Sequence, residues 1–275
     1  MLGASRTSQG EARGRLSQLA DSMAEADLQK LSEDLFAVAE LLARQLPLRR
    51  SLADASTAEP AKTALVDALL RERVGAPALD FMTELVRLRW SRPRDLADAV
   101  ETLAVLASFE QANALGELDD VEDQLFRFGR IVERDTGLRD ALSDEAVPSE
   151  RKRELLAGLL GAKVGAVALR VITAATVASG GRRHVGEALD RDARLAAELR
   201  ERLNARVTVA TELDDGQLDR LGEQLSRVYG KRIGLRVEVD PEILGGVVVR
   251  VGDQVLDASV ARRLDIARRG LTSYA

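Results

Sequence analysis

Residues 239–264 decide the fold class of the last part of the chain, and they read VDPEILGGVVVRVGDQVLDASVARRL. A Gly-Gly pair allows a tight bend before the apolar run at residues 247–251, and a Gly-Asp pair separates that run from a second apolar step. This order of turn, strand, turn and strand predicts a β-hairpin. Asp257 and Ser259 follow the hairpin, and the Ser259 hydroxyl suits the N-cap of a final helix.

The segment upstream of this hairpin belongs to the same module. Val207 and Val209 alternate with polar residues, as in a half-buried strand. Asp214 and Gln217 then have the spacing of a capping box at the start of an amphipathic helix, and a strictly alternating second strand follows. The sequence therefore predicts a separate α+β domain at residues 204–275.

An internal repeat organises the rest of the chain. When the sequence is shifted by 90 positions, residues 28–79 align with residues 118–169 without a gap, and 17 of these 52 pairs are identical. A composition this rich in alanine and leucine produces on the order of one identity in ten by chance. The period is too long for a solenoid unit, so we interpret the repeat as a duplicated helical domain.

Each copy of the repeat places apolar residues three and four positions apart, which predicts amphipathic helices joined by short loops. Pro47 in the first copy and Gly137 in the second are predicted to end the long helix of each copy. The predicted fold class is mainly α, with two related helical-bundle segments followed by a small α+β C-terminal domain. The predicted domains are residues 1–102, residues 103–203 and residues 204–275.

The composition describes an ordinary globular chain with an acidic balance. Of its 275 residues, 45% are hydrophobic and 31% are charged, and the net charge of −5 argues against a global basic field for nucleic acid. The absence of cysteine excludes disulfides and thiolate-ligated metals. Residues 155–178 come nearest to a membrane span, but Lys163 and Arg170 interrupt them, so we interpret this stretch as bundle helices.

The sequence contains no motif for catalysis. The single histidine, His184, has no second histidine and no cysteine with which to form a metal site. Neither the P-loop pattern nor the glycine-rich dinucleotide pattern occurs. Three pairs of adjacent arginines are short and lack interleaved aromatic residues, so they do not indicate nucleic-acid binding. We expect no catalytic residue, no metal, no cofactor and no nucleic-acid partner.

The C-terminal pattern resembles the delta subunit of F-type ATP synthases, whose mitochondrial counterpart is the oligomycin-sensitivity-conferring protein. The motif residues of that family fall at matching positions of this sequence, and the principal ones are Asp240, Gly245, Gly246, Gly252, Asp253, Asp257 and Ser259. The likeness is close over residues 204–275 and looser over residues 103–203. A typical member has one helical domain, so the first copy departs from the family in the manner of long actinobacterial delta subunits.

The resemblance implies a non-catalytic stator subunit in the peripheral stalk of a proton-translocating ATP synthase. The implied partners are the N-terminal segments of the α subunits and the C-terminal helices of the b subunits, with the β subunit as a further candidate. The chain would associate with the cytoplasmic face of the plasma membrane peripherally, only through the complex. A helical adaptor of another membrane-associated complex is the alternative interpretation.

The family binds an α-subunit segment in a groove between its first and fifth helices, which correspond to residues 103–115 and 165–178 of the second copy. The candidate lining consists of apolar side chains on these two segments: Leu106, Phe109, Ala112, Leu169, Ile172 and Val177. Each of them has an alternative interpretation as a core residue, because apolar helix positions usually face inward. The motif residues likewise suit turn and cap geometry. We therefore expect surface positions of this domain to contact the b subunits, and the sequence does not identify them.

Overall fold

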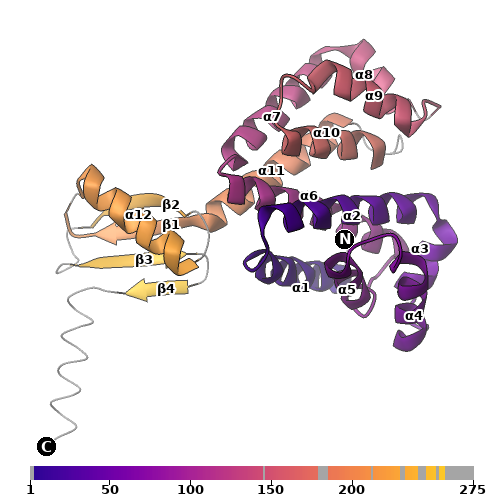
Figure 1. Ribbon diagram of the computed structural model, residues 1–275, viewed down its shortest axis with the longest axis horizontal. Helices are drawn as coiled ribbons and strands as arrows, with labels where there is room; N and C mark the ends of the chain where they lie inside the picture. The colour runs from indigo at the N-terminus through magenta and orange to yellow at the C-terminus, as the bar shows by residue number, and fades with distance from the viewer. Residues whose placement is uncertain are drawn as a thin grey trace, which may run out of the picture. The chain divides into compact units, whose positions relative to one another are not determined.

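The computed structural model describes residues 3–144, 146–178, 185–211, 213–229, 233–240, 246–251 and 254–257. These residues form helices α1–α12 and strands β1–β4 (Figure 1). The chain divides into two compact units, Met1–Ala196 and Ala197–Ala275. A mainly helical chain with a small C-terminal α+β part confirms the predicted fold class. None of the described helices combines the length and the apolar character needed to cross a bilayer.

The helices of the first unit follow the internal repeat. The first copy contains α1 (Gly3–Ala20), α2 (Glu25–Arg44), α3 (Leu46–Ala53), α4 (Glu59–Leu70) and α5 (Ala76–Leu85), and α6 (Pro93–Leu115) comes next. The second copy continues with α7 (Leu118–Arg134), α8 (Thr136–Ser143), α9 (Ser149–Leu160), α10 (Ala166–Ala178) and α11 (Val185–Leu203). The helices α2–α5 therefore recur as α7–α10, 90 positions further along the chain.

Equivalent hydrogen bonds support this correspondence. The Gly75 N–H group, just before α5, donates to Asp34 Oδ2 at 2.8 Å. The Gly165 N–H group, just before α10, donates to Gln124 Oε1 at 2.9 Å. The two acceptors lie 90 positions apart, on α2 and α7. The starts of α5 and α10 are therefore held by equivalent hydrogen bonds, with a carboxylate acceptor in the first copy and an amide acceptor in the second.

The helix α6 serves both copies. It lies 90 positions after α1 and about 90 positions before α11, so it closes the first copy and opens the second. It contacts α1, α2 and α3 as well as α7 and α10, and 15 of its 23 residues are buried. A helix that is buried on nearly every side lies in the interior of its unit. The border expected between residues 102 and 103 lies inside this helix, which ends at Gly116 with a φ of 75°.

The predicted ends of the long helices at Pro47 and Gly137 are wrong by a few residues. The helix α2 ends at Arg44, and Pro47 lies in the first turn of α3, where the missing N–H group of proline costs no hydrogen bond. The helix α7 ends at Arg134, and Gly137 lies within α8. The Asp135 side chain caps α8 by accepting a hydrogen bond from the N–H group of Leu138 at 2.9 Å.

The second unit is a four-stranded sheet with one helix. Its elements are β1 (Asn204–Val209), α12 (Asp215–Tyr229), β2 (Gly234–Val239), β3 (Val247–Val251) and β4 (Gln254–Asp257), and the strand order is β2-β1-β3-β4. The strands β1 and β2 are parallel and α12 connects them, whereas β1 pairs antiparallel with β3. The predicted hairpin is confirmed as the antiparallel pair β3 and β4.

The short sequence motifs of this unit also adopt the predicted local structures. The Asp214 N–H group donates to Gln217 Oε1 at 3.0 Å and the Gln217 N–H group donates to Asp214 Oδ1 at 2.7 Å, which confirms the capping box. The core lies between one face of the sheet and α12. Its buried members include Val207 and Val249 from paired strands and Leu225 from the helix.

Candidate functional site

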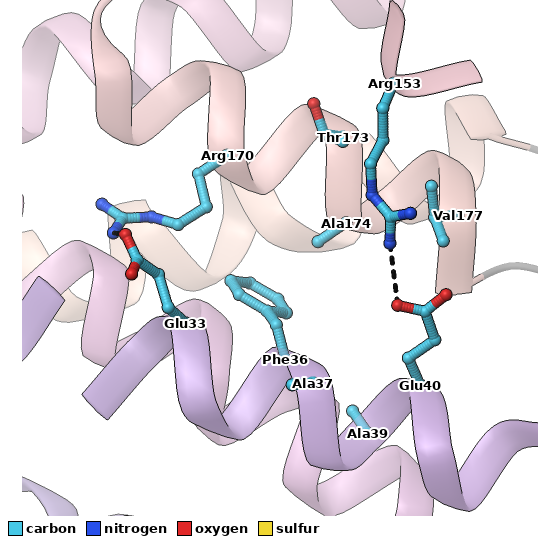
Figure 2. Close-up of a pocket in the computed structure, with 10 residues that line it drawn as sticks. All are labelled: Glu33, Phe36, Ala37, Ala39, Glu40, Arg153, Arg170, Thr173, Ala174 and Val177. Carbon is cyan, nitrogen blue, oxygen red and sulfur yellow. Dashed lines mark hydrogen bonds and ion pairs between the residues drawn. The ribbon is translucent and has the colours of Figure 1, made fainter. Parts of the chain in front are cut away.

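A groove of about 310 Å³ lies between α2 on one side and α9 and α10 on the other (Figure 2). Its lining residues on α2 and on α10 both recur at intervals of three and four, so each wall presents about two turns of one helix face. The ten lining residues are Glu33, Phe36, Ala37, Ala39, Glu40, Arg153, Arg170, Thr173, Ala174 and Val177.

The middle of the groove is apolar. The Phe36 ring projects from α2 toward α10, with Ala174 and Val177 on the facing wall (Figure 2). Phe36 and Val177 are half-buried, and Ala37 is exposed. The small alanine side chains on both walls leave open space beside the ring.

An arginine–glutamate pair stands at each end of the groove. At one end Arg153 on α9 contacts Glu40 on α2 at 2.8 Å, and it also contacts Glu150 of its own helix at 3.2 Å. At the other end Arg170 on α10 lies 3.4 Å from Glu33 on α2. The two glutamates are seven residues apart and therefore lie two turns apart on α2.

Arg170 is incompletely satisfied in this position. Its side chain is 15% exposed, and its Nη2 donates to Gln111 Oε1 on α6. Burial lowers the pKa of the Arg170 guanidinium, and the half-exposed Glu33 offsets this only in part. The buried Nε has no hydrogen-bond partner within the described part of the chain. This enclosed nitrogen therefore carries an unmade hydrogen bond in the present arrangement.

The helix α2 lies against the pair formed by α6 and α10. These two helices contact each other, α7 contacts both of them from within the second copy, and α2 contacts both of them from the first copy. Two packed helices leave one groove on each side. We conclude that α7 fills the inner groove of the pair and that α2 lies in the outer one.

The predicted lining residues have different surroundings. Phe109, Ala112 and Ile172 are fully buried, Leu106 is half-buried against the core of the first copy, and Leu169 is half-buried. Only Val177 of the six lines the groove. In this groove α2 faces α10. The groove between α6 and α10 that the sequence pointed to stays a prediction, and these two helices contact each other.

Sequence reasoning missed Phe36 and the rest of the α2 wall. The prediction placed a groove within one copy of the repeat, and α2 belongs to the other copy. A signal was present in the repeat itself, because α1 aligns with α6 and α6 aligns with α11. A helix shared by two copies must bring elements of the first copy, such as α2, next to elements of the second.

The C-terminal motif residues are described only in part. The Asp240 N–H group donates to the carbonyl oxygen of Val209 at 2.8 Å, which extends the pairing at the end of β2. Gly246 has a φ of 87°, a left-handed conformation that favours glycine. Asp257 ends β4 and pairs with Val248. The remaining motif positions, Gly245, Gly252, Asp253 and Ser259, lie outside the described residues, as does His184.

Comparison with known proteins shows the family. Residues 100–271 match the family model of the ATP synthase delta (OSCP) subunit. The ATP synthase subunit delta of Streptomyces avermitilis is 45% identical over 271 residues, which cover 98% of both chains. The corresponding subunit of Thermobifida fusca is 41% identical over 271 residues, which cover 98% of this chain and 99% of the relative.

The chain belongs to the ATP synthase delta (OSCP) family. Membership confirms the expected kind of subunit, a non-catalytic stalk subunit of an F-type ATP synthase. The family model begins at residue 100, inside α6, whereas the delta subunits of the actinobacteria match almost the whole chain. The first helical copy, with α2, is therefore shared with long delta subunits although the general family model leaves it out.

Proposed function

We propose that this delta-family chain links the catalytic head of a proton-translocating F-type ATP synthase to the b subunits of its peripheral stalk. The observation that carries the proposal is the match to delta subunits over 98% of the chain. The division into two compact units supports it further, because a link between two partners needs a separate surface for each. Such a link keeps the head from turning with the rotor, so that proton flow drives ATP synthesis.

In this proposal the helical unit binds the N-terminal segments of the α subunits and the α+β unit binds the C-terminal helices of the b subunits. The β subunit is a further contact of the helical unit. The chain lies at the cytoplasmic face of the plasma membrane as a peripheral protein, held there by the complex. The apolar groove with charged ends is a surface on the helical unit that fits an amphipathic helix.

Reconstitution tests this function. Membrane vesicles depleted of the chain are expected to lose proton-driven ATP synthesis, and adding back the full chain is expected to restore it. The restored vesicles should also yield the chain together with the α, β and b subunits after solubilisation. Full coupling in vesicles that lack the chain would contradict the proposal, and recovery of the chain with an unrelated complex would favour the adaptor alternative.

A further inference from the structure

We infer that the first helical copy forms one wall of the α-subunit docking site, so that the site is built from both copies. The inference rests on the proposed function, because its occupant is the N-terminal segment of an α subunit bound as an amphipathic helix. It is carried by the groove in Figure 2, whose walls are α2 from the first copy and α9 and α10 from the second. The extra copy is thus part of the binding surface.

The shape of the groove fits one helix face. Both long walls repeat their lining residues at intervals of three and four over two turns. Binding of a helix in a groove uses anchors with this spacing. The exposed Ala37 and the half-buried Ala174 leave room for apolar anchors beside Phe36, on opposite walls.

The charges of the groove define the occupant more closely. Arg170 and Arg153 stand at its two ends, and α2 faces them with Glu33 and Glu40, seven residues apart. Each arginine already pairs with a glutamate, so a docked helix would meet a charge pair at each end of the groove and an apolar stretch between them. The occupant is therefore an amphipathic helix with polar residues at both ends of its apolar stripe.

The repeat supplies a matched comparison within the same chain. The counterparts of Phe36 and Ala37 on α7 are Phe126 and Arg127. Phe126 is 56% exposed and does not line the groove of Figure 2, and the long side chain of Arg127 occupies the place of a small alanine. The second copy therefore carries the same aromatic residue outside this groove.

A peptide titration with the full chain tests the inference. The probe is a labelled peptide with the sequence of the N-terminal segment of the α subunit from the same organism, and fluorescence anisotropy measures its Kd. Phe36→Ala is expected to weaken binding about tenfold or more, because it removes the largest apolar contact of the groove. Phe126→Ala is the matched control and should leave Kd within about twofold.

A second variant is a control in case Phe36→Ala disturbs folding. Ala37→Arg introduces the residue that the second copy carries at the equivalent position, on an exposed site where folding is not disturbed. It is expected to block the groove and to weaken binding as strongly as Phe36→Ala, with an unchanged melting temperature.

The outcomes separate this inference from the proposed function. Peptide binding that is equally tight for the wild type, Phe36→Ala and Ala37→Arg would place the segment elsewhere and overturn the inference alone. Failure of the wild-type chain to bind the peptide would overturn the inference, and loss of coupling in the depleted vesicles would still support the stator role.

Discussion

Arg191 on α11 holds a buried cluster of charges beside α6. Its guanidinium lies 2.7 Å from Glu101 and 2.8 Å from Asp192, whose side chain is fully buried. Burial lowers the pKa of Arg191, but the charges and hydrogen bonds of Asp192 and Glu101 raise it by more. Replacing Arg191 by Met removes the cation that contacts both carboxylates, so we expect a loss of about 3–5 kcal/mol in the free energy of unfolding, measured by urea titration at neutral pH.

The loss caused by Arg191→Met should depend on pH. Without the cation, burial disfavours the charged form of the Asp192 carboxylate in the folded state. The folded variant then binds more protons, so its stability relative to the wild type rises as the pH falls from about 8 to about 5. An equal loss at both ends of this range would show that the carboxylates are not buried as charges.

Asp34 tests whether the repeated hydrogen bond holds the fifth helix of the first copy. Its Oδ2 accepts from the Gly75 N–H group, and its Oδ1 contacts the exposed Lys30 at 2.7 Å. Asp34→Ala should cost about 1–3 kcal/mol of unfolding free energy, because a half-buried N–H group loses its acceptor. Asp34→Asn keeps an acceptor and loses only the ion pair with the exposed Lys30, so it should cost less than about 1 kcal/mol. Equal losses in the two variants would assign the effect to the ion pair.

At the scale of single helices, two glycines have opposite roles. Gly158 lies within α9, and a Cβ atom added there meets nothing within 4 Å. Gly116 ends α6 with a φ of 75°, which an L-amino acid adopts only with strain. Gly158→Ala should stabilise the chain by about 0.4–1 kcal/mol, because alanine restricts the unfolded chain.

Gly116→Ala should instead destabilise the chain by about 1–2 kcal/mol. Thermal unfolding of the two variants, followed by circular dichroism, measures both signs. Stabilisation by Gly116→Ala would contradict the left-handed end of α6.

For the whole molecule, the shared helix decides which fragments fold. Residues 1–203 keep α6 with every helix that covers it, so this fragment should be monomeric and unfold cooperatively. Residues 103–275 begin in the middle of α6 and lose α1, α2 and α3, which exposes the apolar face that these helices bury. We expect this fragment to aggregate, as measured by size-exclusion chromatography. A soluble, cooperatively folded fragment 103–275 would show that the second copy does not need the first.

Much of the fold follows from the sequence because it depends on near neighbours. The Asp214–Gln217 capping box and the β3–β4 hairpin both form where the spacing of a few residues predicts them. The helix ends at Pro47 and Gly137 were misplaced because both residues are compatible with the first turn of a following helix, and Asp135 provides the stronger signal.

The sequence by itself determined the helical class, the 90-residue repeat, the α+β module and the family, since periodicity, turn residues and motifs are written in local order. Only the tertiary structure decided that α6 belongs to both copies and that α2, with Phe36, forms the wall opposite α10. The physical reason is that an apolar helix face does not specify its partner. Which distant segment covers it depends on the packing of the whole unit, and here the first copy covers the second.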